Sequence, residues 1–311
     1  MSKIILPEEK ILILKKKIIL PKEITLAPEI ECLGIKAQSF LKDNPTVFAV
    51  DKDITLDDNL GIEFKPKKYL TYTYEDLNIL KKTLDIINAN GFYVDSTCGG
   101  HIHIGFDYLG SLGALLTLLS IYKYFEREIY TISNEKGNRI RNGCERFAAS
   151  IDSLMNSIEL ELKIRGTSIT PEKLVAAIDE KHKKSDGLNI KNIGNSNKNT
   201  TEFRISNSTL SYNVLDENME LFGSLVMRSK DIFENYYYQL EINRIISEKR
   251  SCGDKINILL NLLFDKDSNR KDIYYERYYA NRDDPMLNNL GMTNTTLKNY
   301  PTIKKVLEKK R

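Results

Sequence analysis

The sequence predicts an α+β fold in which a β-rich part carries the candidate site and a helical extension follows at the C-terminal end. Short segments with strand-like alternation lie between residues 24 and 205, and helical periodicity dominates after Asn213. Three of the short segments share a polar, apolar, polar pattern: Glu29-Ile30-Glu31, His101-Ile102-His103 and Glu202-Phe203-Arg204. Successive side chains of a strand point to opposite faces, so each polar pair is expected on one face of a sheet, above a buried apolar residue.

The first third of the chain is predicted to hold strands and one helix. Residues 1–23 alternate Ile and Leu with charged residues and are expected to form an arm or an edge strand. Apolar residues recur at helical spacing over Tyr74–Asn90, and Gly91 is placed to end that helix. Strands are predicted at Ile24–Leu33, Thr46–Val50, Gly61–Lys65 and, interrupted at Cys98-Gly99-Gly100, at Phe92–Phe106.

Helices dominate the rest of the chain. The apolar run from Leu109 to Tyr122 is shorter than the ~20 residues that span a bilayer, so a buried amphipathic helix is expected over Ser111–Thr131. Thr170-Pro171 is a typical helix start, and that helix is predicted to end near Lys183. The Asn- and Gly-rich segment Gly194–Asn199 is expected to be a mobile loop. The remaining elements are a strand at Thr200–Ile205 and helices at Val214–Lys249, Asp254–Phe264 and Leu297–Lys310.

Three parts are therefore predicted: the arm at residues 1–23, a domain with the polar motifs at 24–228, and the helical extension at 229–311. With 41% hydrophobic residues, the 311-residue chain can bury a substantial core. Its 46 basic and 43 acidic side chains are too balanced to indicate a nucleic-acid-binding protein.

The cysteines and the N-terminal segment indicate the compartment. The four cysteines have no CxxC spacing and are predicted to be free thiols in a reducing environment. The first ten residues contain no continuous apolar segment of the kind found in secretory signals, so the protein is predicted to be cytoplasmic and not bound to a membrane.

The polar pairs are candidate metal ligands. Two of only three histidines lie at His101 and His103, directly after a Gly-Gly pair that allows close approach of the backbone to a ligand. Glu29 and Glu31 could alternatively be solvated surface carboxylates, and Glu202 could form a salt bridge with a neighbouring strand. Together with Glu63, these residues offer four carboxylates and an imidazole without a suitable set of thiolates, which favours Mg²⁺ or Mn²⁺ over zinc.

Arginines supply candidate phosphate contacts. Arg204 can bind a phosphoryl group in a bidentate manner. Arg139, Arg141 and Arg146 lie close together in the sequence, either as a solvated basic turn or as groups that neutralise charge during phosphoryl transfer. The chain has no GxxxxGK[ST], GxGxxG or GxSxG motif, so a nucleotide would be held mainly by metal and arginines.

The order of these motifs resembles the glutamine synthetase and glutamate–cysteine ligase superfamily, and within it most closely the amidoligase family. Pro28, Lys65 and Lys184 stand where the family commonly has other residues. The resemblance covers about residues 24–228, and its most specific parts are STCGGHIHIG and TEFR. The matching stretches are Pro28–Glu31, Val50–Leu56, Gly61–Pro66, Ser96–Gly105, Gly187–Ile190, Thr201–Arg204 and Ser208–Leu210.

The resemblance implies a curved antiparallel sheet with helices on its convex side and the active site in its concave face. It also implies an ATP-dependent ligase, in which a carboxylate attacks the γ-phosphate of ATP and an amine then displaces phosphate from the acyl-phosphate. An amino acid or a peptide would be one substrate. The metal ligands implied are Glu29, Glu31, Glu63, His101 and Glu202. The resemblance places His103, Lys184 and Asn189 at the nucleotide, and Arg204 with one of Arg139, Arg141 and Arg146 at the phosphoryl group.

Two other hypotheses use the same residues. A phosphotransferase on this fold would stop at phosphoryl transfer and make no amide. A non-catalytic protein could use the charged face to capture a metal or a phosphorylated partner, with the basic C-terminal helices as a docking surface. The sequence predicts neither the identity of the two substrates nor the oligomeric state.

Overall fold

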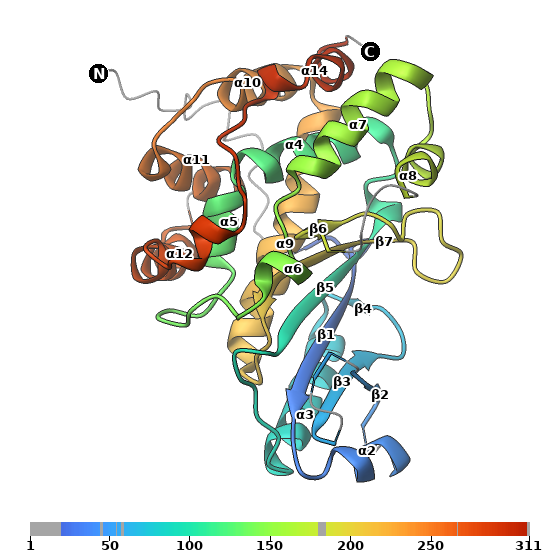
Figure 1. Ribbon diagram of the computed structural model, residues 1–311, viewed down its shortest axis with the longest axis vertical. Helices are drawn as coiled ribbons and strands as arrows, with labels where there is room; N and C mark the ends of the chain where they lie inside the picture. The colour runs from blue at the N-terminus through green and yellow to red at the C-terminus, as the bar shows by residue number, and fades with distance from the viewer. Residues whose placement is uncertain are drawn as a thin grey trace.

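A seven-stranded antiparallel sheet forms the frame of the site in the computed structural model, which describes residues 20–43, 46–53, 55–56, 59–179, 185–265 and 267–309. The strands follow the order β2-β3-β1-β5-β7-β6, and β4 pairs with the beginning of β1 (Figure 1). They are β1 (Thr25–Leu33), β2 (Phe48–Lys52), β3 (Gly61–Pro66), β4 (Leu70–Thr71), β5 (Gly99–Gly105), β6 (Leu188–Asn189) and β7 (Thr200–Asn207).

Thirteen α-helices surround this sheet in the described part of the chain. The part before β6 contains α2 (Ala37–Asp43), α3 (Tyr74–Ala89), α4 (Leu112–Tyr124), α5 (Glu126–Ile132), α6 (Cys144–Phe147), α7 (Asp152–Arg165) and α8 (Pro171–Asp179). The C-terminal part contains α9 (Tyr212–Glu234), α10 (Tyr236–Ile246), α11 (Cys252–Phe264), α12 (Ser268–Asn281), α13 (Met286–Asn289) and α14 (Pro301–Leu307). The larger of two hydrophobic clusters among the described residues includes residues on both sides of the predicted boundary at residue 228, which falls inside α9.

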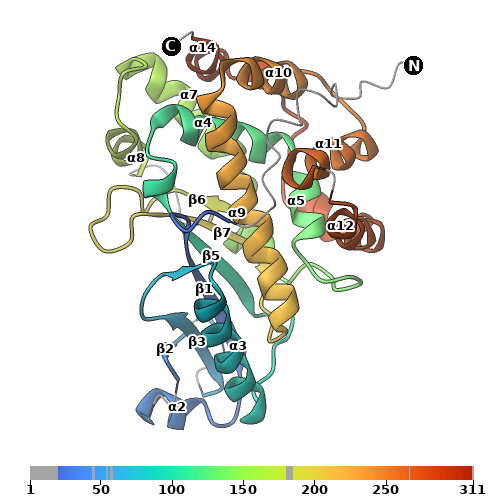
Figure 2. The ribbon, with the colours of Figure 1, turned by 180° about the vertical axis from the view of Figure 1, so that it is seen from behind.

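Helices α3 and α9 cover one face of the sheet (Figure 2). The apolar residues at the centre of the three motifs, Ile30, Ile102 and Phe203, are buried on this side, as the alternation predicts. The ring of Phe203 stacks on Phe222 of α9, with centroids 4.5 Å apart. The polar residues of the motifs are consequently directed to the opposite face.

Several predicted elements are confirmed with small shifts at their ends. Thr73 caps α3 by accepting a hydrogen bond from Asp76 N, and Gly91 follows the helix with a φ of +76°, a conformation that glycine adopts readily. Thr170 accepts from Lys173 N at the start of α8. The four cysteines are free, as predicted.

Other predictions of secondary structure are wrong. The helix predicted over Ser111–Thr131 is divided at Phe125 into α4 and α5, and α4 is buried on all sides rather than amphipathic. It lies against α9, α10 and α14, so no polar face is left toward solvent. The predicted helix Val214–Lys249 is interrupted at Asn235, whose side chain accepts from the first amides of α10.

The predicted strand Phe92–Phe106 begins only at Gly99. Before it, Tyr93 forms an isolated bridge with Leu33. Asp95 then accepts from Thr97 N at 2.7 Å, a local turn that competes with the strand ladder. Helices α2, α7 and α12 were not predicted, and most of the predicted arm, residues 1–19, lies outside the described residues.

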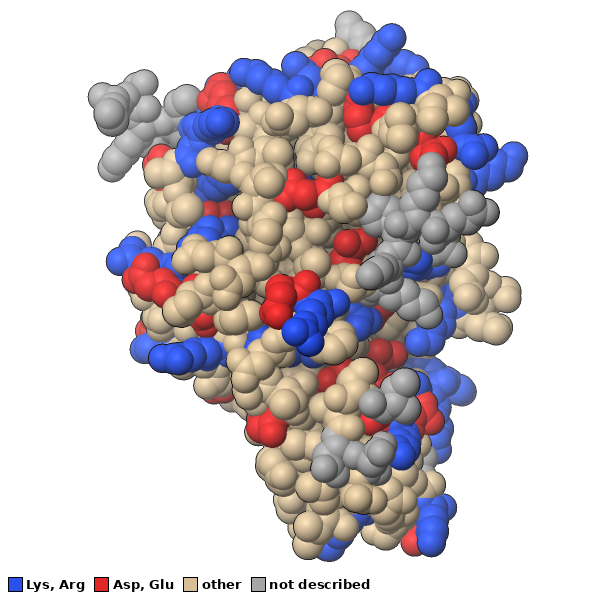
Figure 3. Space-filling model, viewed as in Figure 1, with Lys and Arg blue, Asp and Glu red and all other residues tan. Residues whose placement is uncertain are grey.

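The C-terminal helices place lysines on the surface. Basic side chains gather along the upper rim of the face in Figure 3, over α14. Lys298, Lys304 and Lys305 line a surface groove there, together with Glu308.

Among the described residues, no helix combines the length and the apolar character needed to cross a membrane.

Candidate active site

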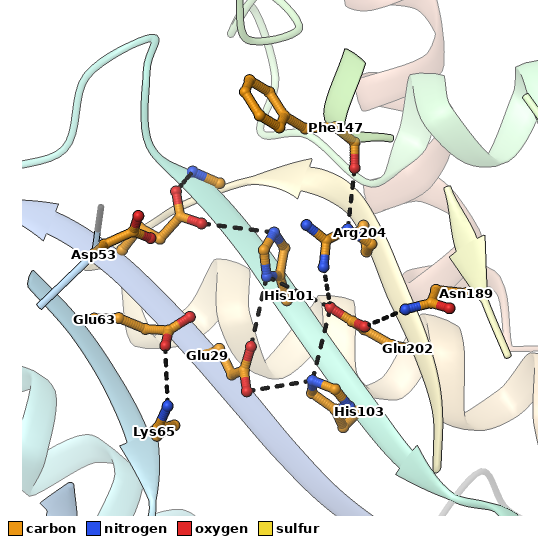
Figure 4. A network of polar contacts seen from close by, with 12 residues as sticks. Glu29, Asp53, Glu63, Lys65, His101, His103, Phe147, Asn189, Glu202 and Arg204 are labelled. Carbon is orange, nitrogen blue, oxygen red and sulfur yellow. Dashed lines mark hydrogen bonds and ion pairs between the residues drawn. The ribbon is translucent and has the colours of Figure 1, made fainter. Parts of the chain in front are cut away.

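The register of the sheet assembles the polar motifs in one row. Glu63 of β3 lies opposite Glu31 of β1, and His103 of β5 lies opposite Glu202 of β7. Glu29 of β1 is likewise paired with His101 of β5. Directly opposite residues of an antiparallel pair share a face, so all of these side chains lie on the side that α3 and α9 leave uncovered (Figure 4).

A β-bulge in β7 determines where Arg204 points. Gly100 pairs with Ser206 but Ile102 pairs with Phe203, so two residues of β7, Arg204 and Ile205, are set against His101 alone. Arg204 remains on the polar face. Ser206 is turned to the helical side, where its hydroxyl accepts from Asn218 of α9 at 3.4 Å.

The two imidazoles lie between carboxylates but do not form good hydrogen bonds with them. His101 Nδ1 is 3.5 Å from Glu29 and 3.6 Å from Glu202, and His101 Nε2 is 3.6 Å from Glu31. His103 Nε2 is 3.3 Å from Glu29 and 3.7 Å from Glu202. Both Nε2 atoms are buried without a hydrogen-bond partner. Buried polar atoms without partners are rare, and here they face a space bounded by acidic oxygens.

This donor set fits a divalent cation. Three overlapping groups could each hold an ion: Glu29 with His103 and Glu202, Glu29 with Glu63 and His101, and Glu31 with Asp53 and Glu63. Within each group the ligand atoms lie within 4.8 Å of one another. Carboxylate oxygens with imidazole nitrogens suit Mg²⁺ or Mn²⁺, and an ion in the first group would satisfy the unpartnered Nε2 of His103, which faces Glu29 and Glu202.

Without a bound cation, ionisation of all the buried carboxylates is unfavourable. Burial raises the pKa of Glu31 to about 7, although the Gly99 N–H and Arg141 act against this shift. Burial and the charge of Glu29 raise the pKa of Glu63 to about 7. For Glu29, burial is outweighed by His101 and His103, which hold the pKa of its carboxyl below the ordinary range. The face therefore favours additional positive charge.

Arg141 is the arginine of the 139–146 cluster that lies against the candidate ligands. Its guanidinium is buried and its Nη1 is 3.9 Å from Glu31 Oε2. It rests on Gly99, where a Cβ atom would overlap the guanidinium. The Gly99 N–H donates to the same Glu31 oxygen at 2.5 Å, so the glycine both makes room for Arg141 and orients Glu31.

Arg139 and Arg146 are exposed. The side chain of Arg146 is 80% exposed and lies 3.8 Å from Glu145, on the solvent side of the loop. Arg204, by contrast, is an ion-pair partner of Glu202, and its Nε donates to the carbonyl of Phe147 at 3.0 Å (Figure 4). The structure thus places Arg141 and Arg204, but not Arg139 and Arg146, next to the acidic row.

Of the three residues predicted at the nucleotide, His103 and Asn189 lie in the polar row and the third is not described. His103 Nδ1 is 2.9 Å from Thr200 Oγ1, which leaves its Nε2 directed at the carboxylates. Asn189 Nδ2 donates to Glu202 Oε2 at 2.8 Å and fixes that side chain from β6. Lys184 lies outside the described residues.

Three site residues were not predicted as such. Asp53 follows Asp51 at the same i, i+2 spacing as the other polar pairs, so the pattern was present in the sequence. Lys65 pairs with Asp51 at 2.5 Å and with Glu63 at 3.3 Å, and alternation with Glu63 could have indicated it. Lys198, 3.4 Å from Glu29 Oε1, comes from an irregular loop, and no sequence pattern indicates its position.

A family model described as "Putative amidoligase enzyme" matches residues 56–226, which is more than half of the chain. The matched segment includes Glu63, the His101–His103 motif, Arg141 and the Glu202–Arg204 motif, whereas Glu29 and Glu31 precede it. No curated protein gives a significant match to the chain.

Proposed function

Since the chain belongs to the amidoligase family, we propose that it is an ATP-dependent ligase that joins a carboxylate to an amine, with an amino acid or a peptide as one substrate. We also propose that its sheet is of the curved glutamine-synthetase type, with the reaction on the face opposite α3 and α9. The observation that carries the proposal is the polar row itself. Three overlapping ligand groups lie on one sheet face, with the guanidinium groups of Arg141 and Arg204 beside them.

The proposed reaction has two steps. A carboxylate oxygen of the first substrate attacks the γ-phosphorus of ATP, the bond to the β-phosphate oxygen breaks, and ADP and an acyl-phosphate result. The amine nitrogen of the second substrate then attacks the acyl carbon, phosphate leaves with the C–O electron pair, and the nitrogen loses a proton. The sum is an amide, ADP and inorganic phosphate.

Charge is the main obstacle to the first step, because ATP and the carboxylate are both anions. Mg²⁺ or Mn²⁺ held by Glu29, Glu31, Glu63, His101 and Glu202 would supply neutralising charge for the phosphates. The two arginines would add fixed positive charge beside the transferring phosphoryl group.

The described contacts make this part of the site rigid before a substrate binds. Asn189 and Arg204 hold Glu202, and the Gly99 N–H with Arg141 holds Glu31. Thr200 fixes the ring of His103 through Nδ1. Such preorganisation lowers the cost of aligning charged groups during the reaction.

Incubation with ATP, Mg²⁺ and pools of amino acids, peptides and amines tests the proposal. We expect amine-dependent phosphate release together with a product whose mass equals the two substrates minus one water. Glu31→Ala and Glu202→Ala should lose activity by roughly 10³-fold or more, since metal ligands act as a unit. Asp85→Ala, an exposed change on α3, is the matched control.

The other outcomes of this experiment are also informative. A phosphorylated product without an amide would identify a phosphotransferase. Metal binding without ATP turnover would favour a non-catalytic binding protein. Equal activity of the wild type, Glu31→Ala and Glu202→Ala would refute the proposed site.

A further inference from the structure

The loop between α5 and α6 carries Arg141, and it passes beside the C-terminal helix α12 before it reaches the sheet (Figure 1). This loop has little regular structure of its own. Its position, and with it the position of the arginine, depends on partners from other elements.

Two buried polar side chains of the C-terminal region hold the first part of the loop. Asn281, the last residue of α12, accepts from Gly137 N at 2.9 Å through its Oδ1. Its Nδ2 donates to the carbonyls of Thr131, Asn134 and Glu135 at 3.1–3.2 Å. Asp284 Oδ2 accepts from Ile140 N at 2.8 Å, directly before the arginine in the sequence.

The end of β7 holds the same loop from the other side. Asn207 Oδ1 accepts from Arg141 N at 2.9 Å, and its Nδ2 donates to the carbonyl of Arg139 at 2.7 Å. The backbone amides of Ile140 and Arg141 are therefore fixed by consecutive hydrogen bonds to opposite sides, one to Asp284 and one to Asn207. These bonds fix the backbone position from which the Arg141 side chain reaches Gly99 and Glu31.

We propose that Asn281 and Asp284 are positioning residues for Arg141, and that the C-terminal helical region thereby completes the active site. These two residues lie outside the segment that the family model matches, residues 56–226. We call the hydrogen bonds of Asn281 and Asp284 to the loop the clamp. The effect of the clamp on catalysis rests on the proposed function, whereas the clamp itself does not.

If Asp284 had a purely structural role, its replacement would lower stability without a specific effect on the Arg141 loop. Its Oδ1 accepts from Met286 N at 2.8 Å at the start of α13, so loss of the carboxylate also removes a local turn contact. Glu159 provides a matched control. It is a buried carboxylate that accepts from Thr302 N and Ile303 N, and so holds the start of α14 instead of the Arg141 loop.

The first test measures the loop directly in the full-length protein. Backbone hydrogen exchange should become about 10-fold faster or more at residues 137–141 in Asp284→Ala and Asn281→Ala, but not in Glu159→Ala. Arg141 should also react faster with a dicarbonyl reagent specific for guanidinium groups. Its side chain is only 4% exposed in the wild type, and release of the loop would expose it. Asp284→Asn, which keeps one acceptor oxygen, should give intermediate values. Unchanged exchange and reactivity would overturn the proposal.

The second test connects the clamp to activity. Asp284→Ala should lower kcat by about 10–10²-fold with unchanged Mg²⁺ affinity, because a small displacement of a catalytic group is enough for such a loss. In an Arg141→Met background the same change should have no further effect. Equal losses in Asp284→Ala and Glu159→Ala at matched Tm, or additive losses with Arg141→Met, would refute the positioning role. If the wild type turns over no substrate, the proposed function fails, and hydrogen exchange still decides on the clamp.

Discussion

Gly99 and Arg141 are mutually dependent: the guanidinium occupies the space above Gly99 that any larger residue would need for its Cβ atom. The two glycines before the His101–His103 motif therefore have different roles. Gly99 accommodates the arginine, whereas a Cβ atom at Gly100 would lie 2.7 Å from the carbonyl oxygen of Asn207. The glycine pair therefore reflects close packing of β5 against the Arg141 loop at Gly99 and against the end of β7 at Gly100.

Gly99→Ala should displace Arg141 and lower kcat by about 10–10²-fold, because the phosphoryl contact is moved while the amide of residue 99 can still donate to Glu31 and hold that ligand. Steady-state kinetics together with Mg²⁺ titration will separate the two effects. Gly253→Ala is the control, since the nearest atom to an added Cβ there is 3.9 Å away. Wild-type kinetics in Gly99→Ala would contradict this role of the contact.

The candidate ligands could be predicted from the sequence because alternation in a strand is a local property. The side chains of Glu29 and Glu31 point to one face whatever their neighbours are, and the register then brings that face together with His101. The polar pattern also predicts the burial of Ile30 on the other side. Strand-level information was therefore enough to propose the row of carboxylates and histidines.

The choice among the arginines could not be made in this way. Arg139, Arg141 and Arg146 are equivalent in the sequence, and the structure distinguishes them through contacts with Asn207 and Asp284, which lie far along the chain. The burial of α4 on all sides has a similar origin, since it depends on helices α9, α10 and α14. Contacts of this kind leave no periodic trace in the sequence.

The structure predicts unequal consequences of losing the three arginines. Arg141→Met should reduce turnover on the order of 10²–10³-fold, since a buried cation next to the metal ligands is removed. Arg146→Met and Arg139→Met should stay close to the wild type because both side chains are exposed. Parallel measurement of kcat for the three variants tests this order. A large loss in Arg146→Met would place the phosphoryl group on the solvent side of the loop.

The affinity for Mg²⁺ should increase with pH between about 6 and 8. Glu31 and Glu63 have pKa values raised to about 7, so each must release a proton before it can bind a cation well. Titration calorimetry in buffers of different ionisation enthalpy will show the proton release. The pH dependence should be shallower in Glu63→Gln. An affinity that does not change with pH would contradict the raised pKa values.

The metal-free protein should become less stable as the pH rises from about 5 to 7. The pKa of Glu63 is raised from 4.5 to about 7 by burial, so the folded state binds its proton more tightly than the unfolded state does, and this stabilisation is lost as the carboxyl ionises. At pH 8 in EDTA, Glu63→Gln should therefore have a higher free energy of unfolding than the wild type, by on the order of 1 kcal/mol. The difference should vanish near pH 4.5. Urea unfolding at both pH values provides the comparison, and a destabilised Glu63→Gln at pH 8 would contradict it.

Lys198 should weaken cation binding in the resting protein. Its Nζ is 3.4 Å from Glu29 Oε1, the oxygen that also faces His103, so its charge competes with a divalent ion for the same carboxylate. Because the lysine side chain is 48% exposed, the effect is partly screened, and Lys198→Met should raise Mg²⁺ affinity by only about 2–5-fold. The gain should shrink at high salt. Lys68→Met, an exposed change in the β3–β4 connection, should leave the affinity unchanged. A lower affinity in Lys198→Met would show instead that the lysine holds the loop in a conformation that the ion requires.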